Sequence, residues 1–427
     1  MNIKSALKTL GLSVIATTWI IAGGMKAEGQ SAMVHSLPSK KLIEFGWDKP
    51  TPAYFKEHFS EMEKRPFNGV GIEIPEAVGG GNIFLKSQWG KVSEEGKQKQ
   101  LDILKSIPVS KSFTDNFIMI HAASDLNWFD EAGWKMAEDQ LRFLAKAAKA
   151  GHCKGVFWDA ESYGGVNPWD FQKQIDRDKH PFTEFATRIR KCGKHFVEVL
   201  QEEYPGLTIL SMRQLSDFQT GSPFSASMLP IHDLKSAEAR LPTEWWGLHI
   251  AFTNGILDAI KPDTKFIDAN EDAYFYTSPT DFFRFTHTMR QDALALVAPE
   301  NRVKYLSQYQ LGHAVSVEYT QGAWATAISF PNYLRAQALE LSPADRLRWF
   351  GQNLYYALTT SDEYVWCYSE KMNWWTGENI PAGMEAAILD IRGKLAKGEP
   401  LGYNIEPQLL SAQETIKKRD AKIKKSE

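Results

Sequence analysis

The sequence predicts an α/β fold, a single-domain (β/α)8 TIM barrel, on three observations. From residue 41 onward, short β-branched and aromatic runs alternate with amphipathic segments, as expected of repeated βα units around a parallel sheet. Eight such alternations can be counted, which favours closure of the sheet into a barrel. The apolar runs are also continuous, which indicates strands that are buried on both faces by surrounding helices.

The predicted strands share a short length and a high content of β-branched and aromatic side chains. In chain order they cover residues 41–47, 69–74, 116–121, 155–158, 207–212, 265–269, 303–309 and 363–368. Apolar residues recur at helical spacing in the segments 51–64, 131–150, 181–203, 279–296 and 343–359. Two of these helices begin at a Ser-Pro pair, Ser278-Pro279 and Ser342-Pro343, which is typical of a helix N-terminus.

A doubly wound open sheet is the alternative to a barrel. That fold carries a glycine-rich loop after its first strand, where the phosphates of a nucleotide bind. Here the first strand is followed by Gly46-Trp47-Asp48-Lys49-Pro50, which offers no such loop. The barrel is therefore the better prediction.

The first 32 residues are typical of a secretion signal. Lys4 and Lys8 precede the apolar run 10–24, and small residues follow at Gly23, Gly24 and Ala27. We expect cleavage of this segment and a secreted or periplasmic protein that is not held in a membrane; an uncleaved anchor is the alternative. The first cysteine is Cys153, so the apolar run offers no site for a lipid anchor.

The remaining chain is predicted to contain a catalytic barrel over residues 33–410 and a basic tail over 411–427. Lysine and arginine number 49 and aspartate and glutamate 52, and the two signs are interspersed, which argues against nucleic acid as a partner. Three cysteines within apolar or helical stretches are expected in the core rather than in disulfides. No cofactor is expected, and the sequence does not indicate an oligomeric state.

Acidic residues follow three of the predicted strands. In a barrel, the carboxyl ends of the strands and the loops after them form the active face. Asp159 and Glu161 follow the fourth strand, Asp268 and Glu271 the sixth, and Glu370 the eighth. We therefore predict these five acids as the catalytic candidates.

The spacing of Asp159 and Glu161 suggests acid catalysis. Residues two apart on an extended strand point to the same side, and like charges at that distance raise one pKa. Glycosidic cleavage requires such a protonated acid together with a second carboxylate, for which Glu370, Asp268 and Glu271 are the candidates. Ion pairs with neighbours such as Lys371 or Arg213 are the alternative role for these acids.

Aromatic residues near the strand ends support recognition of sugars, because their flat apolar faces can stack on pyranose rings. Core packing is the alternative for each, notably for Trp158, which lies within a strand, and for Trp169. The predicted substrate-binding residues are Trp47, Asp48, His121, Trp128, Tyr163, Tyr274, Gln308, Trp374 and Trp375.

Metal-dependent chemistry is the competing enzyme class. His121 and Asp125 could join Asp159 or Asp268 around a divalent ion, but no His-x-His or His-Glu-x-x-His spacing is present. No metal ligand is therefore predicted. A Gly-x-Ser-x-Gly turn is also missing, which argues against a Ser-His-Asp triad.

The segment 155–161 resembles strand four of (β/α)8 glycoside hydrolases. Its Asp159-Ala160-Glu161 triplet is similar to the end of the Asp-x-Asp-x-Glu signature of the chitinase-like glycoside hydrolase family 18, although Phe157 and Lys154 replace the two earlier acids. The resemblance implies Glu161 as proton donor and Asp159 as the group that assists an N-acetyl neighbour. Similarity to retaining α-galactosidase-like barrels implies instead Asp159 as nucleophile and Asp268 as acid.

The resulting hypothesis is a secreted glycoside hydrolase acting on a polysaccharide or oligosaccharide. Glu161 would be the general acid/base beside Asp159, and Glu370 or Asp268 the opposing carboxylate. The alternatives are a barrel that binds carbohydrate without cleaving it and a metal-dependent hydrolase on the same fold.

Overall fold

The computed structural model describes residues 40–84, 93–124, 127–163, 165–218, 239–322 and 332–426. The predicted signal segment 1–32 lies outside the described residues, as does Asp125. None of the helices within these ranges combines the length and apolarity that a bilayer crossing demands.

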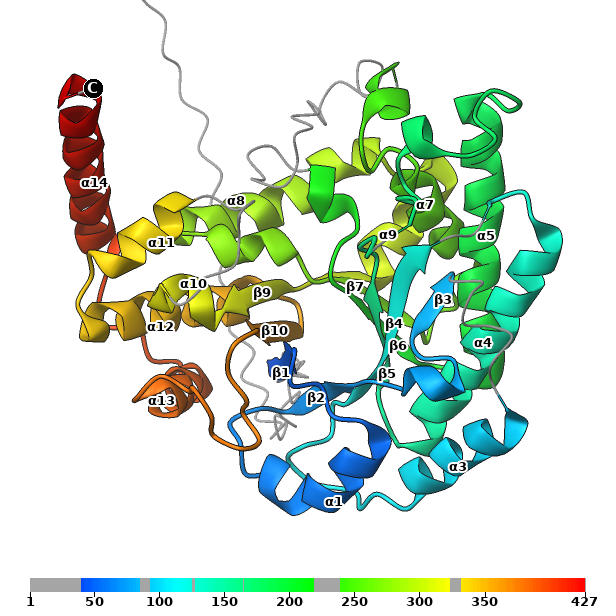
Figure 1. Ribbon diagram of the computed structural model, residues 1–427, viewed down its shortest axis with the longest axis horizontal. Helices are drawn as coiled ribbons and strands as arrows, with labels where there is room; N and C mark the ends of the chain where they lie inside the picture. The colour runs from blue at the N-terminus through cyan, green and yellow to red at the C-terminus, as the bar shows by residue number, and fades with distance from the viewer. Residues whose placement is uncertain are drawn as a thin grey trace, which may run out of the picture. The chain divides into compact units, whose positions relative to one another are not determined.

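A ring of parallel strands forms the centre of the fold (Figure 1). Neighbouring strands pair in the order β8-β7-β6-β5-β4-β2-β1-β10-β9. Because only Gly312 separates β8 from β9 in the chain, the two ends of this order adjoin. We call each strand position in the barrel wall a stave; β8 and β9 together form one stave, and the barrel has eight. The strands are β1 (Lys41–Gly46), β2 (Gly69–Ile72), β4 (Phe117–Ser124), β5 (Gly155–Asp159), β6 (Thr208–Ser211), β7 (Lys265–Asp268), β8 (Tyr309–Leu311), β9 (His313–Ser316) and β10 (Tyr364–Ser369). This arrangement confirms the predicted (β/α)8 barrel.

A short additional strand extends the barrel wall beyond β2. The chain leaves β2, forms the 3-10 turn η1 (Glu76–Val78) and returns as β3 (Asn82–Phe84). Both β2 and β3 pair in parallel with β4, β2 near its start and β3 near its end. The wall is therefore taller on this side, next to the carboxyl end of β4.

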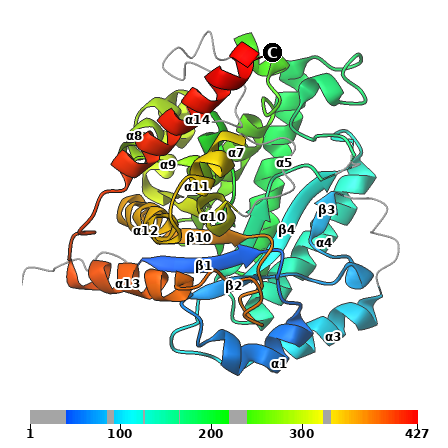
Figure 2. The ribbon, with the colours of Figure 1, turned by 60° about the vertical axis from the view of Figure 1, so that its left-hand side comes forward.

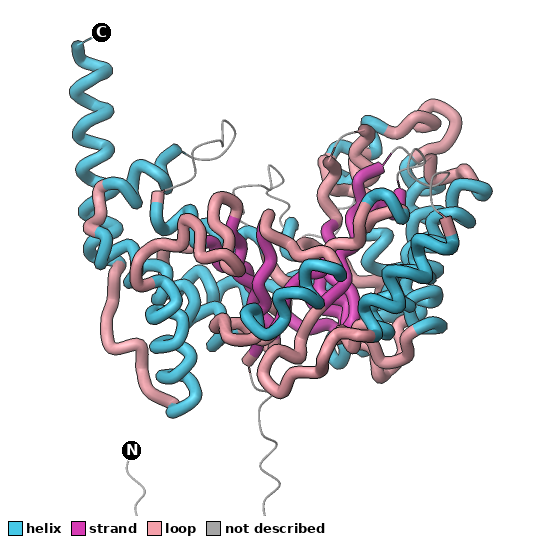
Figure 3. The backbone as a smooth tube through the Cα atoms, turned by 60° about the horizontal axis from the view of Figure 1, so that its bottom comes forward, coloured by secondary structure: helices cyan, strands magenta, loops and turns pink. Residues whose placement is uncertain are grey.

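Helices surround the strands, as Figures 2 and 3 show from two further directions. Several begin as predicted: Thr51 caps α1 and Ser342 caps α12, while Ser278 and Asp281 form a capping box at α8. The helices are α1 (Pro52–Met62), α3 (Glu94–Lys105), α4 (Glu131–Ala150), α5 (Phe182–Glu203), α7 (His249–Ala259), α8 (Pro279–Arg290), α9 (Arg302–Gln308), α10 (Val317–Gln321), α11 (Asn332–Leu339), α12 (Pro343–Thr360), α13 (Met384–Lys397) and α14 (Glu406–Ser426).

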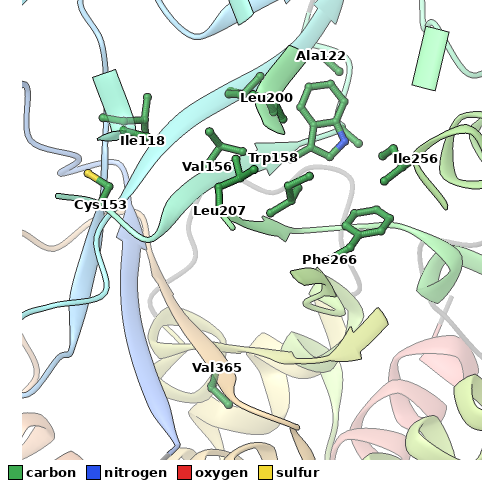
Figure 4. Close-up of a cluster of buried hydrophobic side chains, with 14 of the residues drawn as sticks. Ile118, Ala122, Cys153, Val156, Trp158, Leu200, Leu207, Ile256, Phe266 and Val365 are labelled. Atoms are coloured by element: carbon green, nitrogen blue, oxygen red, sulfur yellow. The ribbon is translucent and has the colours of Figure 1, made fainter. Parts of the chain in front are cut away.

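Alternate residues of each strand supply two hydrophobic layers. The layer inside the barrel contains Phe45, Phe157 and Trp366, whose rings contact one another. The layer between barrel and helices contains Val156 and Trp158 of β5 (Figure 4). Burial on both faces explains the continuous apolar runs of the sequence. The three cysteines are buried and unpaired, as predicted.

Seven of the eight predicted strands coincide with observed ones, and the prediction for residues 303–309 is wrong. That segment is α9, and the strand begins only at Tyr309. Val303 and Leu306 are exposed while Tyr305 is buried, which is the pattern of a short surface helix rather than of an enclosed strand. The tail boundary predicted at residue 411 falls inside α14, which begins at Glu406.

Candidate active site

Arg213, two residues after the end of β6, lies at the centre of a group of carboxylates at the carboxyl ends of the strands. Its Nε contacts Glu161 Oε1 at 3.3 Å and also contacts Glu271 Oε2, while Nη1 donates to Asp217 Oδ1 at 2.9 Å. Arg213 is 2 % exposed. The structure therefore joins acids from the staves β5 and β7 through one buried guanidinium.

Glu161 is held by its neighbours on the loop after β5. Its backbone N–H donates to Asp159 Oδ1 at 2.9 Å, and the Tyr163 hydroxyl donates to its carboxylate. The Glu161 side chain remains 27 % exposed. Glu161 thus forms the ion pair with Arg213 that was the alternative to a catalytic role, yet its carboxyl group can be reached from outside.

Glu271 is positioned by an unusual backbone turn after β7. The preceding residue, Asn270, adopts a left-handed conformation with φ 36°, which is costly for a residue other than glycine and tends to occur at functional sites. Its side-chain amide donates to Tyr276 Oη and His313 Nδ1, both at 3.1 Å. These bonds hold the turn that directs Glu271 toward Arg213.

The electrostatics favour a proton on the Glu161–Glu271 pair. Burial raises the pKa of both carboxyl groups and Arg213 opposes that rise; Asp159 raises the pKa of both further, and Glu161 raises that of Glu271. Burial also raises the pKa of Asp217, to about 8, although the guanidinium is adjacent. Because one guanidinium cannot compensate several buried carboxylates, we infer that one acid of the pair is protonated at neutral pH.

His121 supports Asp159 from the neighbouring stave β4. Its Nδ1 lies 3.1 Å from Asp159 Oδ2 and its Nε2 lies 3.0 Å from Glu73 Oε2, and Lys49 approaches Glu73 at 3.5 Å. Burial alone would lower the pKa of His121, but Glu73 and Asp159 raise it to about 9. The charged ring therefore donates to both carboxylates. Since both nitrogens are occupied, His121 orients Asp159 rather than binding substrate directly.

Tyrosines and one tryptophan line the opposite side of the barrel mouth. Tyr274 stacks on Tyr368 with 5.3 Å between ring centroids and contacts Tyr319 at 5.8 Å. The indole N–H of Trp47 donates to Tyr368 Oη at 2.9 Å, and 70 % of Trp47 is exposed. Of the predicted binding residues, Trp47 and Tyr163 are exposed, whereas Tyr274 is buried against Tyr368 and Tyr319.

Asp268 must be reassigned from catalysis to the scaffold. Its carboxylate accepts hydrogen bonds from the hydroxyl of Ser216 at 2.6 Å, from the backbone N–H of Ser216 at 2.8 Å and from Tyr309 Oη at 2.7 Å. It is fully buried. With its oxygens engaged and no exposed surface, Asp268 fixes the loop after β6 and is not available to substrate.

Glu370 lies at the same end of the barrel but outside the group around Arg213. Its side chain is 8 % exposed and its carboxylate is 3.8 Å from Lys371 Nζ. Its backbone N–H donates to Glu318 Oε1 at 2.6 Å. Of the candidates for the opposing carboxylate, only Glu271 shares a contact atom with Glu161.

Trp374 and Trp375 have structural roles, and neither presents an exposed ring on which a sugar could stack. Trp374 is fully buried, its indole N–H donates to Ser369 Oγ at 3.0 Å, and its backbone N–H donates to Asp48 Oδ2 at 2.7 Å. Trp375 donates through its indole to the carbonyl of Asp48 at 2.8 Å. Asp48 therefore anchors this loop, and all three predicted sugar contacts are corrected.

Two further binding predictions are corrected. Trp128 is 2 % exposed and donates to the carbonyl of Pro168 at 2.9 Å, so it belongs to the core. Gln308, at the end of α9, donates to the carbonyl of Thr264 at 3.4 Å. That carbonyl precedes β7, so Gln308 lies at the amino end of the barrel, away from the mouth. Trp158 and Trp169 are likewise fully buried.

Arg213 and Glu73 contact the predicted acids and His121 but were not among the predicted site residues. Glu73 directly follows β2, so the rule that selected acids at strand ends could have found it. Arg213 follows β6 and was considered only as an ion-pair partner. Across the described ranges, no three His, Cys, Asp or Glu side chains are arranged as ligands of a metal ion.

No protein-family model and no curated protein matches the sequence. Solved structures with a similar fold include a glycoside hydrolase family 5 enzyme from Prevotella bryantii, with 11 % identity over 79 % of this chain and 86 % of that chain and a TM-score of 0.41. A family 18 chitinase from Pseudoalteromonas aurantia has 10 % identity over 82 % and 100 % of the two chains, with a TM-score of 0.39. A sugar phosphate isomerase/epimerase from Parabacteroides distasonis has 9 % identity over 85 % and 100 %, with a TM-score of 0.32. Similarities this low assign neither family nor activity.

Proposed function

We propose that this protein is a glycoside hydrolase in which Glu161 is the general acid/base and Glu271 the opposing carboxylate. One observation carries the proposal: carboxylates from the staves β5 and β7 both contact Nε of Arg213. Raised pKa values on both groups, caused first by burial, supply the shared proton that such a pair needs. Secretion to the periplasm or the medium, as predicted from residues 1–32, is part of the proposal.

The separation of the two carboxylates favours retention of configuration. Because both contact the same nitrogen atom, their nearest oxygens are closer than the roughly 6.5 to 9.5 Å that separates the carboxyl groups of inverting glycosidases. That spacing leaves no room for a water molecule between Glu271 and the sugar. Glu271 would therefore attack the sugar itself.

In the proposed first step, Glu271 attacks the anomeric carbon while the glycosidic C–O bond breaks and Glu161 donates its proton to the leaving oxygen. In the second step, a water oxygen attacks the same carbon, Glu161 accepts the proton of that water, and the Glu271 carboxylate leaves. Arg213 stabilises Glu271 as a carboxylate at the start and end of this cycle. Asp159, held by His121, orients Glu161 through its backbone N–H.

The proposal is tested with a panel of oligosaccharides and polysaccharides. Glu161→Gln and Glu271→Gln each keep the size of the side chain and remove the acid, so kcat on any cleaved glycan should fall at least ~100-fold, the usual scale for a lost acid/base group. Glu370→Gln is the matched control, because Glu370 lies at the same mouth without contacting Arg213. The anomer first released, followed by NMR, should retain the configuration of the substrate.

Two results would contradict the proposal. If both glutamine variants hydrolyse as fast as the wild type, the pair at Arg213 is not catalytic. If the wild type binds a glycan in the panel but cleaves none, the protein is a carbohydrate-binding barrel instead.

A further inference from the structure

A second exposed tryptophan, Trp245, lies near the mouth of the barrel. Among the described residues, the large exposed aromatic side chains are Trp47, Tyr163 and Trp245 at 70, 55 and 55 % and Phe283 at 53 %. Phe283 lies on the outer layer, against Tyr356 of α12. The other three all follow the carboxyl ends of strands, where a substrate of the proposed hydrolase would enter.

Trp245 is fixed beside the loop that follows β5. It lies between the 3-10 turn η4 (Leu241–Thr243) and α7, and its carbonyl accepts a hydrogen bond from Asn167 Nδ2 at 3.3 Å. The Leu248 N–H donates to the carbonyl of Trp169 at 3.0 Å, so the segment is tied to that loop at two points. Its position is therefore set by the scaffold.

The ring of Trp246 lies between Trp245 and the group of residues around Arg213. The buried Trp246 has its ring centroid 5.9 Å from that of Trp245, and the Arg213 guanidinium lies 5.8 Å from the Trp246 centroid. Arg213 in turn contacts Glu161 and Glu271. The exposed indole of Trp245 is thus linked to Arg213 through the ring of Trp246, on the β6 side.

Trp47 is linked to the same pair from the β1 side, through two tyrosines. It bonds Tyr368, which stacks on Tyr274, and Tyr274 is close enough to Glu271 for the carboxylate to contribute to the raised pKa of the tyrosine, after burial. In the ring of eight staves, β1 and β6 are separated by three staves in either direction. Trp47 follows β1 and Trp245 lies in the connection that leaves β6, so the two exposed tryptophans belong to diametrically opposite staves.

We infer that Trp47 and Trp245 are sugar-stacking platforms on opposite sides of the cleaved bond. The substrate is then a chain of pyranose units that continues beyond the cleaved bond in both directions, so that internal bonds are cleaved. An exposed indole offers a sugar ring an apolar face at a low entropic cost, because the scaffold already holds it. This inference rests on the proposed function and adds the class of substrate.

The inference is tested with labelled cello-, xylo-, manno- and chito-oligosaccharides from disaccharide to hexasaccharide. Trp245→Ala and Trp47→Ala should each lower kcat/KM on the cleaved hexasaccharide about tenfold, which corresponds to about 1.4 kcal/mol, and should affect the disaccharide much less. Phe283→Ala is the matched control, because it removes an equally exposed ring far from the mouth. Calorimetry in the Glu161→Gln background should show the same dependence on chain length without turnover.

The possible outcomes separate the inference from the proposed function. If the wild type hydrolyses hexasaccharides and Trp245→Ala behaves like Phe283→Ala, the second platform is refuted while the hydrolase stands. If the wild type neither binds nor cleaves any of these oligosaccharides, the proposed function and the inference both fail.

Discussion

At the scale of single residues, one buried arginine determines what the neighbouring acids can do. Arg213 carries one positive charge and contacts Glu161, Glu271 and Asp217. A buried carboxylate without full compensation accepts a proton instead. The protonation that the proposed catalysis needs therefore follows from charge balance around Arg213, and no unusual property of Glu161 itself is required.

His121 should make the stability of the protein depend on pH. A pKa of about 9 in the folded state, against an ordinary value of about 6.5, means that the folded state binds the extra proton more tightly. The stabilisation is fully present below pH 6.5 and is lost as the pH rises through about 9; it amounts to roughly 3 kcal/mol. We expect the free energy of unfolding of the wild type, relative to His121→Gln, to decrease across that window in urea titrations.

The exposed His287 on α8 provides the control for this measurement. His287→Gln replaces an exposed imidazole that contacts neither Glu73 nor Asp159, and its free energy of unfolding is measured over the same pH range for comparison. A His121→Gln difference that stays constant from pH 6 to pH 10 would show that His121 is not charged between Glu73 and Asp159.

Sequence reasoning selected the acids that the structure brings together at Arg213, but not their arrangement. Asp159, Glu161 and Glu271 were predicted because they follow strands, and that rule depends only on the barrel topology. The choice of Glu271 over Asp268 depends on which way each side chain turns after β7. That direction is set by the left-handed Asn270 and by the hydrogen bonds of Ser216 to Asp268. The sequence shows no pattern for either feature, because the residues that bond Asn270 and Asp268 are contributed largely by other staves.

At the scale of elements, helices α5 and α7 cross with almost no space between their backbones. A Cβ atom built on Gly193 would lie 2.2 Å from the carbonyl oxygen of Phe252, and one on Gly255 would lie 2.0 Å from that of Arg190. Glycine is thus required at both crossing points. The close crossing brings α7, and with it the segment of Trp245, against the barrel beside β6.

Gly255→Ala should therefore destabilise the protein by about 1 to 3 kcal/mol, the usual cost of overpacking a core. Gly393→Ala on α13 is the matched change, because a Cβ atom there would meet nothing within 4 Å. At that position the methyl group should stabilise the protein by about 0.4 to 1 kcal/mol, because it restricts the unfolded chain. Thermal unfolding of both variants checks the pair, and equal shifts in Tm would contradict the close crossing.

Prediction of the elements failed where a strand was short and its neighbours were amphipathic. The run 303–309 has β-branched and aromatic residues, yet it forms α9, and the wall of the barrel at this stave consists of β8 and β9 on either side of Gly312. Seven residues cannot distinguish a half-buried strand from two helical turns by periodicity. The other strands were predicted because enclosure makes them apolar on both faces.

At the scale of the whole molecule, the barrel is closed by pairing between β10 near the C-terminus and β1 near the start of the described chain. Six residues of β1, Lys41 to Gly46, pair in register with β10. Segments separated by more than 300 residues must therefore meet before the mouth exists. The candidate site draws its groups from β4, β5, β6 and β7 and from the β1–β10 pair, so it depends on closure of the complete ring.

The C-terminal helix α14 belongs to this folded unit, although its composition suggested a solvated basic tail. Leu409, Ala412 and Ile416 are at most 9 % exposed, α14 packs against α11, and Gln337 of α11 donates to the carbonyl of Leu409 at 2.9 Å. The spacing of these three residues places them on one face of the helix. Between Lys417 and Lys422 the basic side chains are exposed, and Arg419 forms a 2.9 Å pair with Glu340.

Two truncations test this division of α14. Removal of residues 406–427 takes away the buried side chains of Leu409 and Ile416 and exposes the apolar surface that α14 covers. This loss of burial should lower the free energy of unfolding by about 3 to 6 kcal/mol. Removal of residues 418–427 takes away the exposed pair of Arg419 with Glu340 and should change the free energy of unfolding by less than about 1 kcal/mol. Urea unfolding of both truncated proteins beside the full chain gives the comparison. Equal stability of the two truncated proteins would mean that the apolar face of α14 does not contribute to the folded core.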